Sequence, residues 1–280
     1  MVSINDFRMP LEDTVDYVIA KAQKGLGLTN RALAEKAGTD RAGILEAGKG
    51  RGSDALYNRL AEVLGLDPGA LREIARSTYH PALASAPQGL FQITTAYKDF
   101  SVNAYLVRDP KSREAAVFDT GTNASALLDL ISNENLQLTA IYLTHTHRDH
   151  VMDLDKLRNR SGAPVYTGWE EPWPNARAFR EGKSFSVGSL SVQTLSTKGH
   201  ARGGITYLVE GFPEGPVAIV GDAVFAGSIG GPLVSYDLAR QTIIQNILPL
   251  PPETVLAPGH GPLTTLPKEK SHNPFLAAWA

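Results

Sequence analysis

The stretch IYLTHTHRDH, residues 141–150, places three histidines and an aspartate within six positions directly after an apolar run. Side chains alternate along a strand, so His145 and His147 would project from the strand end to the same side. If a helix follows, its first turn would bring Asp149 and His150 toward a neighbouring point. Four ionisable side chains are costly to bury at a strand end unless they are paired or metal-bound. The pattern therefore indicates a site for divalent cations.

A pair of ions needs more donors than this window supplies, and three later corners of the chain offer them. His200 in STKGHARGG, Asp222 in IVGDAVFAG and His260 in APGHGPL each lie beside a glycine that allows a sharp turn. Imidazole and carboxylate bind divalent metals at about 2.0–2.2 Å, and ions about 3.5–4 Å apart can share a hydroxide. The chain has no cysteine, so every ligand must offer nitrogen or oxygen. The two remaining histidines, His80 and His272, have no comparable setting.

The bulk composition is that of a soluble globular protein. The 280 residues include 42% hydrophobic and 20% charged side chains, and the length favours one large domain plus a small one. A net charge of −2 argues against nucleic acid or an acidic membrane as a partner of the whole chain. We find no run of roughly 18 apolar residues and no secretory signal pattern, so we expect a cytoplasmic protein without a membrane partner.

The chain divides into two segments that differ in their predicted secondary structure. Residues 1–76 predict five short helices in quick succession, with Thr29, Ser53 and Asp67 as N-cap residues. Residues 77–89, STYHPALASAPQG, predict a linker. The remainder, residues 90–280, alternates short β-prone runs with helical stretches, which predicts an α/β domain. The helical stretches expected there are 125–134, 151–160 and 237–248.

The first segment resembles the Cro and lambda-repressor (XRE-type) helix-turn-helix domain, through LTNRALAEKAGTDRAGILEAGKGRGSDALYNRLAEVLGLDP. The resemblance implies that a third helix, residues 39–47, enters the DNA major groove, with Arg41, Lys49 and Arg51 as contacts. Residues 1–80 contain 11 basic and 11 acidic side chains, however, and so lack the basic stripe of most DNA-binding modules. The alternative is a helical bundle used for docking or for forming a homodimer.

The second segment has a more specific resemblance. H-x-H-x-D-H, then G-H, G-D and G-H in this order resembles the metallo-β-lactamase fold superfamily over residues 92–276. The stretches GDAVFAGSIGG and PPETVLAPGHGPLTTLPKEKSHNPFL look most like its glyoxalase II (hydroxyacylglutathione hydrolase) branch. The resemblance implies an αββα sandwich with the site at one edge of two sheets. It also implies hydrolysis of a small ester or thioester by a hydroxide bridging two divalent ions, with zinc preferred over iron or manganese.

The same resemblance assigns ligands and roles to particular residues. Asp222 would bridge the ions, and Asp149 would act both as a ligand and as the group that orients the hydroxide. Zinc β-lactamases usually have cysteine or serine at the position of Asp222, so antibiotic hydrolysis is not the expected activity. The complete ligand sets are His145, His147 and His200 for one ion, and Asp149, His150 and His260 for the other, with Asp222 shared.

Some substrate-holding parts of the glyoxalase II pattern are not matched. Lys198 precedes Gly199, and Arg202 follows the third histidine as a candidate anion-binding residue. Two alternatives therefore stay open. One is a persulfide dioxygenase with a single iron held by His145, His200 and Asp222. The other is a DNA-binding regulator whose metallohydrolase-like half acts as a sensor.

Overall fold

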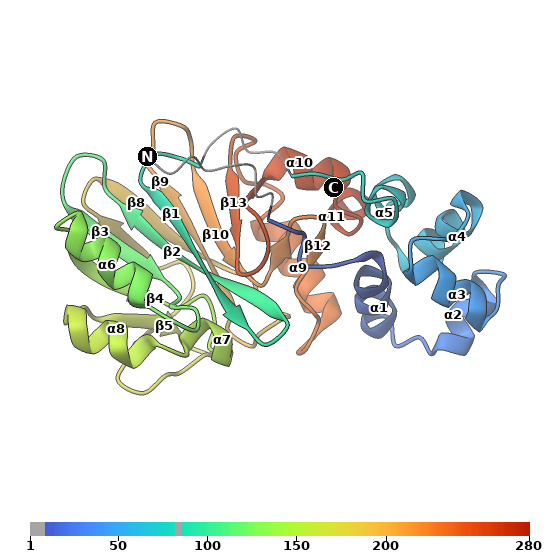
Figure 1. Ribbon diagram of the computed structural model, residues 1–280, viewed down its shortest axis with the longest axis horizontal. Helices are drawn as coiled ribbons and strands as arrows, with labels where there is room; N and C mark the ends of the chain where they lie inside the picture. The colour runs from blue at the N-terminus through green and yellow to red at the C-terminus, as the bar shows by residue number, and fades with distance from the viewer. Residues whose placement is uncertain (1–8, 82–85) are drawn as a thin grey trace.

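The computed structural model describes residues 9–81 and 86–280, and places a helical unit at one end of a two-sheet sandwich (Figure 1). The five helices expected near the N-terminus are present. They are α1 (Val15–Gly25), α2 (Asn30–Lys36), α3 (Arg41–Gly48), α4 (Asp54–Leu64) and α5 (Pro68–Ala75). No helix among the described residues is both long and apolar enough to cross a membrane.

The predicted helix starts in this unit are confirmed by their capping hydrogen bonds. The side chains of Thr29, Ser53 and Asp67 accept from backbone N–H groups three residues further on. The third helix was expected from residue 39, and this boundary was wrong. Asp40 accepts a hydrogen bond from the Gly43 backbone N–H at 2.8 Å, so it is the cap, and α3 begins at Arg41.

The first sheet contains β1 to β6 in sequence order. Strands β1 to β3 are antiparallel, whereas β3 to β6 run parallel and are connected through α6, α7 and α8. The expected helix 151–160 is divided in two, because Asp153 accepts a hydrogen bond from the Ala124 N–H at 2.8 Å at the break. The elements are β1 (Leu90–Tyr97), β2 (Phe100–Arg108), β3 (Glu114–Phe118), α6 (Ser125–Asn133), β4 (Gln137–Tyr142), α7 (Arg148–Val151), α8 (Leu154–Ser161), β5 (Val165–Gly168) and β6 (Arg177–Phe179).

The second sheet has the order β14-β13-β10-β9-β8-β7, and a small hairpin, β11-β12, follows β10. Aromatic side chains from both sheets, among them Phe118, Tyr142 and Tyr207, meet in the core between them. Helices α6 and α8 cover the outer face of the first sheet. The αββα sandwich is therefore confirmed. The elements are β7 (Ser184–Val187), β8 (Leu190–Ser196), β9 (Ile205–Glu210), β10 (Val217–Gly221), β11 (Val224–Phe225), β12 (Ser228–Ile229), α9 (Tyr236–Asn246), β13 (Val255–Pro258), β14 (Thr264–Thr265), α10 (Leu266–His272) and α11 (Leu276–Trp279).

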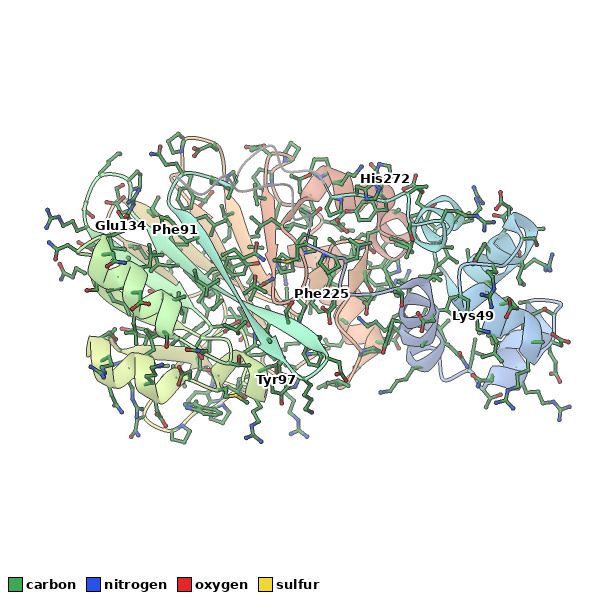
Figure 2. The ribbon with its side chains drawn as sticks, viewed as in Figure 1. Lys49, Phe91, Tyr97, Glu134, Phe225 and His272 are labelled. Carbon is green, nitrogen blue, oxygen red and sulfur yellow. The ribbon has the colours of Figure 1, made fainter. Side chains whose placement is uncertain are left out.

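The helical unit and the sandwich share one hydrophobic core. Side chains of α1, α4 and α5 pack in the same cluster as side chains of β10, β13 and α9 to α11. Within the expected linker, Tyr79 is buried, donates a hydrogen bond to Glu269 and stacks on His272. His272 lies in α10, close to the helical unit (Figure 2). Residues 82–85 of that stretch lie outside the described residues. Tyr79 is therefore part of the packed interior, whereas its neighbours Thr78 and His80 are exposed.

Candidate metal centre

The turn between β4 and α7 brings His145 and His147 together, as their spacing predicts. His145 Nε2 lies 3.0 Å from His147 Nδ1, and His200 Nε2 lies 2.9 Å from the same His147 atom. Three imidazole nitrogens thus converge on one point from segments more than fifty residues apart. Four donors around one tetrahedral ion would be about 3.3 Å apart, so this spacing fits a metal ion.

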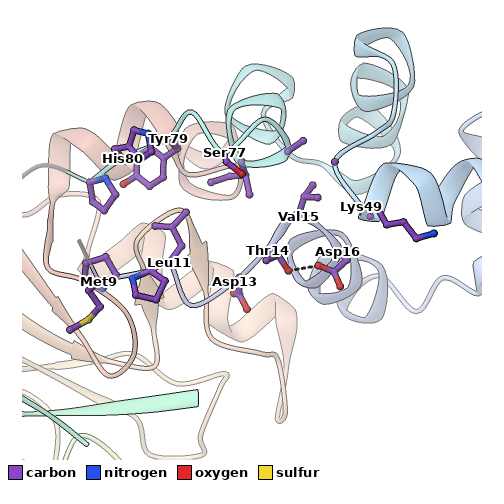
Figure 3. Close-up of a pocket in the computed structure, with 17 residues that line it drawn as sticks. Met9, Leu11, Asp13, Thr14, Val15, Asp16, Lys49, Ser77, Tyr79 and His80 are labelled. Atoms are coloured by element: carbon purple, nitrogen blue, oxygen red, sulfur yellow. Dashed lines mark hydrogen bonds between the residues drawn. The ribbon is translucent and has the colours of Figure 1, made fainter. Parts of the chain in front are cut away.

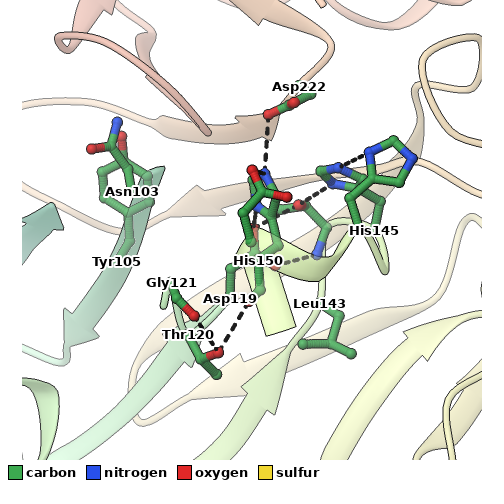
Figure 4. Close-up of polar contacts among 12 residues, drawn as sticks. Asn103, Tyr105, Asp119, Thr120, Gly121, Leu143, His145, His150 and Asp222 are labelled. Atoms are coloured by element: carbon green, nitrogen blue, oxygen red, sulfur yellow. Dashed lines mark hydrogen bonds and ion pairs between the residues drawn. The ribbon is translucent and has the colours of Figure 1, made fainter. Parts of the chain in front are cut away.

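A second group of donors lies beside the first. His260 Nε2 is 3.4 Å from Asp149 Oδ2, and His150 Nε2 is 3.9 Å from that oxygen. Asp222 lies between the groups, since its Oδ2 is 3.2 Å from His200 Nε2 and 3.3 Å from His260 Nε2. Its Oδ1 faces His150 Nε2 at 3.3 Å (Figure 4). All seven residues expected as ligands therefore meet at one edge of the two sheets. Three groups have donor atoms within 4.8 Å of one another: His145, His147 and His200; His145, His150 and Asp222; Asp149, His150 and His260.

Four of the histidines are held through Nδ1, which leaves Nε2 facing inward. His200 Nδ1 donates to the Gly231 carbonyl at 2.8 Å, and His260 Nδ1 donates to the Ser101 carbonyl at 2.6 Å. His145 Nδ1 donates to Thr144 Oγ1, and His150 Nδ1 donates to a buried carboxylate. A hydrogen bond at one ring nitrogen fixes the tautomer and leaves the lone pair of the other for a metal.

Asp119, which the sequence analysis did not single out, supplies that buried carboxylate. Its Oδ2 accepts from His150 Nδ1 at 2.8 Å and from Thr144 Oγ1 at 2.7 Å, while Oδ1 accepts from the Thr144 N–H. Asp119 therefore supports His150 directly and His145 through Thr144. Its position at the end of the apolar run AAVF was the available signal, because Asp222 ends a strand in the same way.

Glu171 is a second residue that the sequence analysis did not single out. Its carboxylate accepts from the Thr146 N–H and from the Gly203 N–H, both at 3.1 Å. Thr146 lies between His145 and His147, and Gly203 belongs to the turn after His200. One side chain thus ties together the two segments that carry the first donor group. No local sequence pattern around Glu171 predicts these contacts, because they form only when the fold brings the two segments together.

Glycines near the centre allow close backbone approach. A Cβ on Gly259 would lie 2.2 Å from Asp222 Oδ1, and one on Gly230 would lie 1.8 Å from the Asp222 carbonyl oxygen. Gly199, just before His200, has a φ of +130°, which disfavours any side chain. The expectation that glycines shape these corners is confirmed, although at Gly259 the cause is crowding and not a positive φ.

Burial and mutual charge shift the pKa values of these groups. Burial lowers the pKa of His145 well below its usual value and also lowers that of His200. Burial opposes the charged form of His260 as well, but Asp222 outweighs it and raises the pKa of His260 to about 9. Burial would raise the pKa of Asp222, yet His260 and His150 hold it well below its usual range. The protein alone thus favours the neutral form of His145 and His200 and the protonated form of His260.

Two buried atoms without a regular hydrogen bond test whether the site fits a metal ion. His150 Nε2 and Asp222 Oδ1 are buried without a hydrogen-bond partner, and they lie 3.3 Å from each other. Buried polar atoms are nearly always paired, and an orphaned pair is explained when an ion binds to both. The donor set, all nitrogen and oxygen, suits zinc, iron or manganese. The residues present therefore fit divalent metal ions.

The remaining predicted contacts lie on the surface. Arg202 is exposed in the turn after His200, which is compatible with an anion-binding role but does not test it. On the helical unit, Lys49 and Arg51 both form ion pairs with Glu46, and Arg41 is exposed. Pairing with Glu46 reduces the charge that these side chains offer to phosphate groups. DNA contact by these residues remains a prediction.

A large cavity of the described structure lies away from the metal centre. About 670 Å³ lies between the segment before α1, the end of α3 and the residues after α5, with Leu11, Ile74 and Tyr79 in its lining (Figure 3). Of the loop that carries His260, only Pro262 lines this cavity, and no residue of the three donor groups lines it. We therefore place the chemistry at the sheet edge.

Comparison with known proteins identifies the family. Residues 97–260 match the model of the metallo-β-lactamase superfamily, so the chain belongs to this superfamily. The match begins after the helical unit, whose resemblance to a helix-turn-helix domain is therefore not confirmed. The hydroxyacylglutathione hydrolase GloC of Haemophilus influenzae is 30% identical over 202 residues, which cover 63% of this chain and 93% of that protein.

Three solved structures share the sandwich. BLEG-1 B3 metallo-β-lactamase is 32% identical with a TM-score of 0.58, covering 67% of this chain and 99% of its own. TTHA1623 in a di-iron-bound form is 31% identical with a TM-score of 0.57, covering 66% and 100%. ETHE1 from Myxococcus xanthus is 26% identical with a TM-score of 0.58, covering 66% and 83%. The fold is thus shared by proteins of several descriptions, and the site must decide among activities.

Proposed function

We propose that this protein is a hydrolase of small esters or thioesters that holds two divalent metal ions, zinc in preference to iron or manganese. One ion would be held by His145, His147 and His200, and the other by Asp149, His150 and His260, with Asp222 shared. The observation that carries this proposal is the buried His150 Nε2 facing Asp222 Oδ1 at 3.3 Å, where neither atom has a regular hydrogen bond. The likeness to GloC and to a di-iron protein supports it.

Two bound ions would supply an ionised water as nucleophile and positive charge beside the substrate carbonyl oxygen. The side chains of this chain prepare that arrangement. Asp222 remains ionised because the surrounding histidines keep its pKa low. Asp149 is nearly buried beside His260, where its carboxylate can orient the attacking water and hold its proton. Asp119 and Glu171 keep the donor segments in place.

The substrate class follows from the leaving group. A thiolate has a conjugate acid with a pKa near 8.5, so it departs near neutral pH without a strong general acid. Thioesters and activated esters therefore suit this centre, where Asp222 is held ionised and Asp149 lies beside His260, so that no strong general acid is present. Zinc β-lactamases usually have cysteine or serine at the position of Asp222, so this aspartate favours thioesters and activated esters over β-lactams as substrates. BLEG-1 B3 metallo-β-lactamase nevertheless shares the fold.

One alternative, which the sequence left open, is an iron-dependent persulfide dioxygenase. That enzyme class would use His145, His200 and Asp222 around a single ion. The second donor group would then have no role, although His260 Nδ1 and His150 Nδ1 are both fixed so that Nε2 faces inward. A complete second group is better explained by a second ion.

Metal analysis and turnover test this proposal on the full-length protein. We expect two metal ions per chain, hydrolysis of hydroxyacyl thioesters, and no oxygen consumption with glutathione persulfide. His147→Ala should lower kcat/KM by about 100-fold or more, since even outer contacts of metal ligands are worth 10–100-fold. His80→Ala, at an exposed histidine outside the centre, should change nothing. One iron per chain together with oxygen consumption would establish the alternative.

A further inference from the structure

We propose that the acyl part of the substrate is an apolar chain, held by exposed apolar side chains around the metal centre. This inference rests on the proposed hydrolase function and specifies its substrate class. The apolar rim, as we name it, consists of Phe100, Met152, Trp169, Leu233 and Val234.

Most of the exposed apolar side chains belong to segments that also carry or hold the metal donors. Eight large hydrophobic residues are exposed among the described residues, and five of them form the rim, with exposed fractions from 39% to 59%. The other three, Tyr17, Leu26 and Leu45, lie on the helical unit. Single exposed apolar residues are ordinary, whereas a group around a reactive centre indicates a binding surface.

On the His260 side, the rim is attached to the second donor group. The Phe100 ring centroid lies 5.4 Å from the His260 ring, and the next residue, Ser101, accepts the His260 Nδ1 hydrogen bond. Met152 directly follows α7, the helix that carries Asp149 and His150. Both exposed side chains are therefore fixed by segments that also position metal donors.

On the His200 side, the rim is attached to the first donor group. The Val234 N–H donates to the Gly199 carbonyl at 3.0 Å, which places Leu233 and Val234 beside His200. Trp169 follows the last residue of β5, two residues before Glu171, which ties the His145 and His200 segments together. The rim thus approaches the donors from both sides.

Charges close to Trp169 do not oppose an apolar ligand. Lys198 is paired with Glu170 and Glu181, at 2.9 and 3.2 Å. The Arg180 guanidinium lies over the Trp169 ring, 5.2 Å from its centroid. Arg202 is exposed and is therefore available to contact an anionic leaving group.

A series of thioesters with one common thiol and straight acyl chains from acetyl to decanoyl tests the inference on the metal-loaded, full-length protein. We expect kcat/KM to rise about two- to fourfold for each methylene before it levels off, because a fully buried methylene is worth about 0.8 kcal/mol, or fourfold. A short hydroxyacyl thioester should be a poorer substrate than the octanoyl thioester.

Two rim variants have matched controls on the helical unit. Leu233→Ser should reduce the decanoyl-to-acetyl ratio of kcat/KM at least about fivefold, whereas Leu45→Ser should not, although the two leucines are 59% and 54% exposed. Trp169→Ala and Tyr17→Ala, at 57% and 59% exposed, form a second pair with the same expectation.

Failure of this inference can be separated from failure of the proposed function. Turnover of every thioester with no dependence on chain length would overturn the apolar acyl site and leave the hydrolase standing. Absence of turnover on all esters and thioesters, with two ions bound, would overturn both. If Leu233→Ser changed the sedimentation behaviour without changing the chain-length dependence, the rim would be a contact between copies of the chain and the inference would be wrong.

Discussion

Lys21 provides the sharpest test of how the helical unit is joined to the metal-bearing sandwich. From α1, its Nζ donates to the Ile229 carbonyl at 2.7 Å, pairs with Asp13, and lies 4.9 Å from the Phe225 ring centroid. The side chains of Lys21 and Asp13 are only 14% and 6% exposed. Lys21→Met keeps most of the stem and removes the charge, so Asp13 and the Ile229 carbonyl lose their partner.

The expected cost follows from this burial. Removing one partner of a buried ion pair lowers the free energy of unfolding by about 3–5 kcal/mol. Because Lys21 is partly exposed, we expect a loss at the lower end of this range, about 3 kcal/mol. For a chain of this size, such a loss lowers Tm by roughly 6 °C or more. Ile229 lies two residues before Gly231, whose carbonyl holds His200, so kcat/KM should fall about tenfold as well.

Thermal unfolding at a fixed excess of metal, followed by circular dichroism, measures the loss. The control is Arg31→Met, which removes a pair with Glu35 whose side chains are 89% and 62% exposed, and should cost less than about 0.5 kcal/mol. Adding Asp13→Leu to Lys21→Met removes the stranded carboxylate and should restore about 1 kcal/mol or more.

Equal Tm values for Lys21→Met and Arg31→Met would refute this reasoning, because they would show that the buried pair contributes no more than an exposed one. Strict additivity of Lys21→Met and Asp13→Leu would refute it as well. A loss of stability with unchanged kcat/KM would limit the role of Lys21 to the interface.

Two further predictions concern metal binding. Asp119→Asn keeps the shape of the side chain but removes one acceptor from Thr144 and His150. The affinity for metal, measured by competition with a chelator, should therefore fall about 10–100-fold. Unchanged affinity would contradict the supporting role of Asp119. Asp222 raises the pKa of His260 to about 9, so below that pH an ion at the His260 group must displace a proton. Burial lowers the pKa of His145, so its group should retain metal at lower pH. Metal content after dialysis between pH 9 and 6 should thus fall from two ions toward one, and a simultaneous loss of both would contradict this.

The candidate site could be predicted from the sequence because its ligands carry strong local signals. Histidine and aspartate are rarely placed together at strand ends without a chemical reason, and each distant donor lies beside a glycine. The residues that support the ligands lack such signals. Glu171 acts on Thr146 and Gly203 only because the fold brings β5 near the His200 turn. Contacts of this kind depend on tertiary structure and not on spacing along the chain.

The helix starts of the first segment were predictable for a similar reason. A capping side chain acts on backbone three residues away, so Thr29 and Ser53 reveal their role in the local sequence. Asp40 has the same property, yet the helix was expected to begin earlier, at residue 39. The shared core was not predictable, since the apolar face of α1 does not specify whether it packs within the bundle or against the sandwich.

This shared core explains why a helix-turn-helix order occurs here without a basic surface. Order and spacing of helices are determined by the packing of their apolar faces, whereas DNA binding requires unpaired cations on the outer face of α3. Here Lys49 and Arg51 are paired with Glu46, whereas Arg41 and Leu45 are exposed on that helix. Meanwhile Lys21 of α1 donates to the Ile229 carbonyl of the sandwich, two residues before Gly231, which holds His200. Contacts of the helical unit such as that of Lys21 thus reach the segment that supports His200, and the order of its helices by itself is evidence of packing, not of DNA binding.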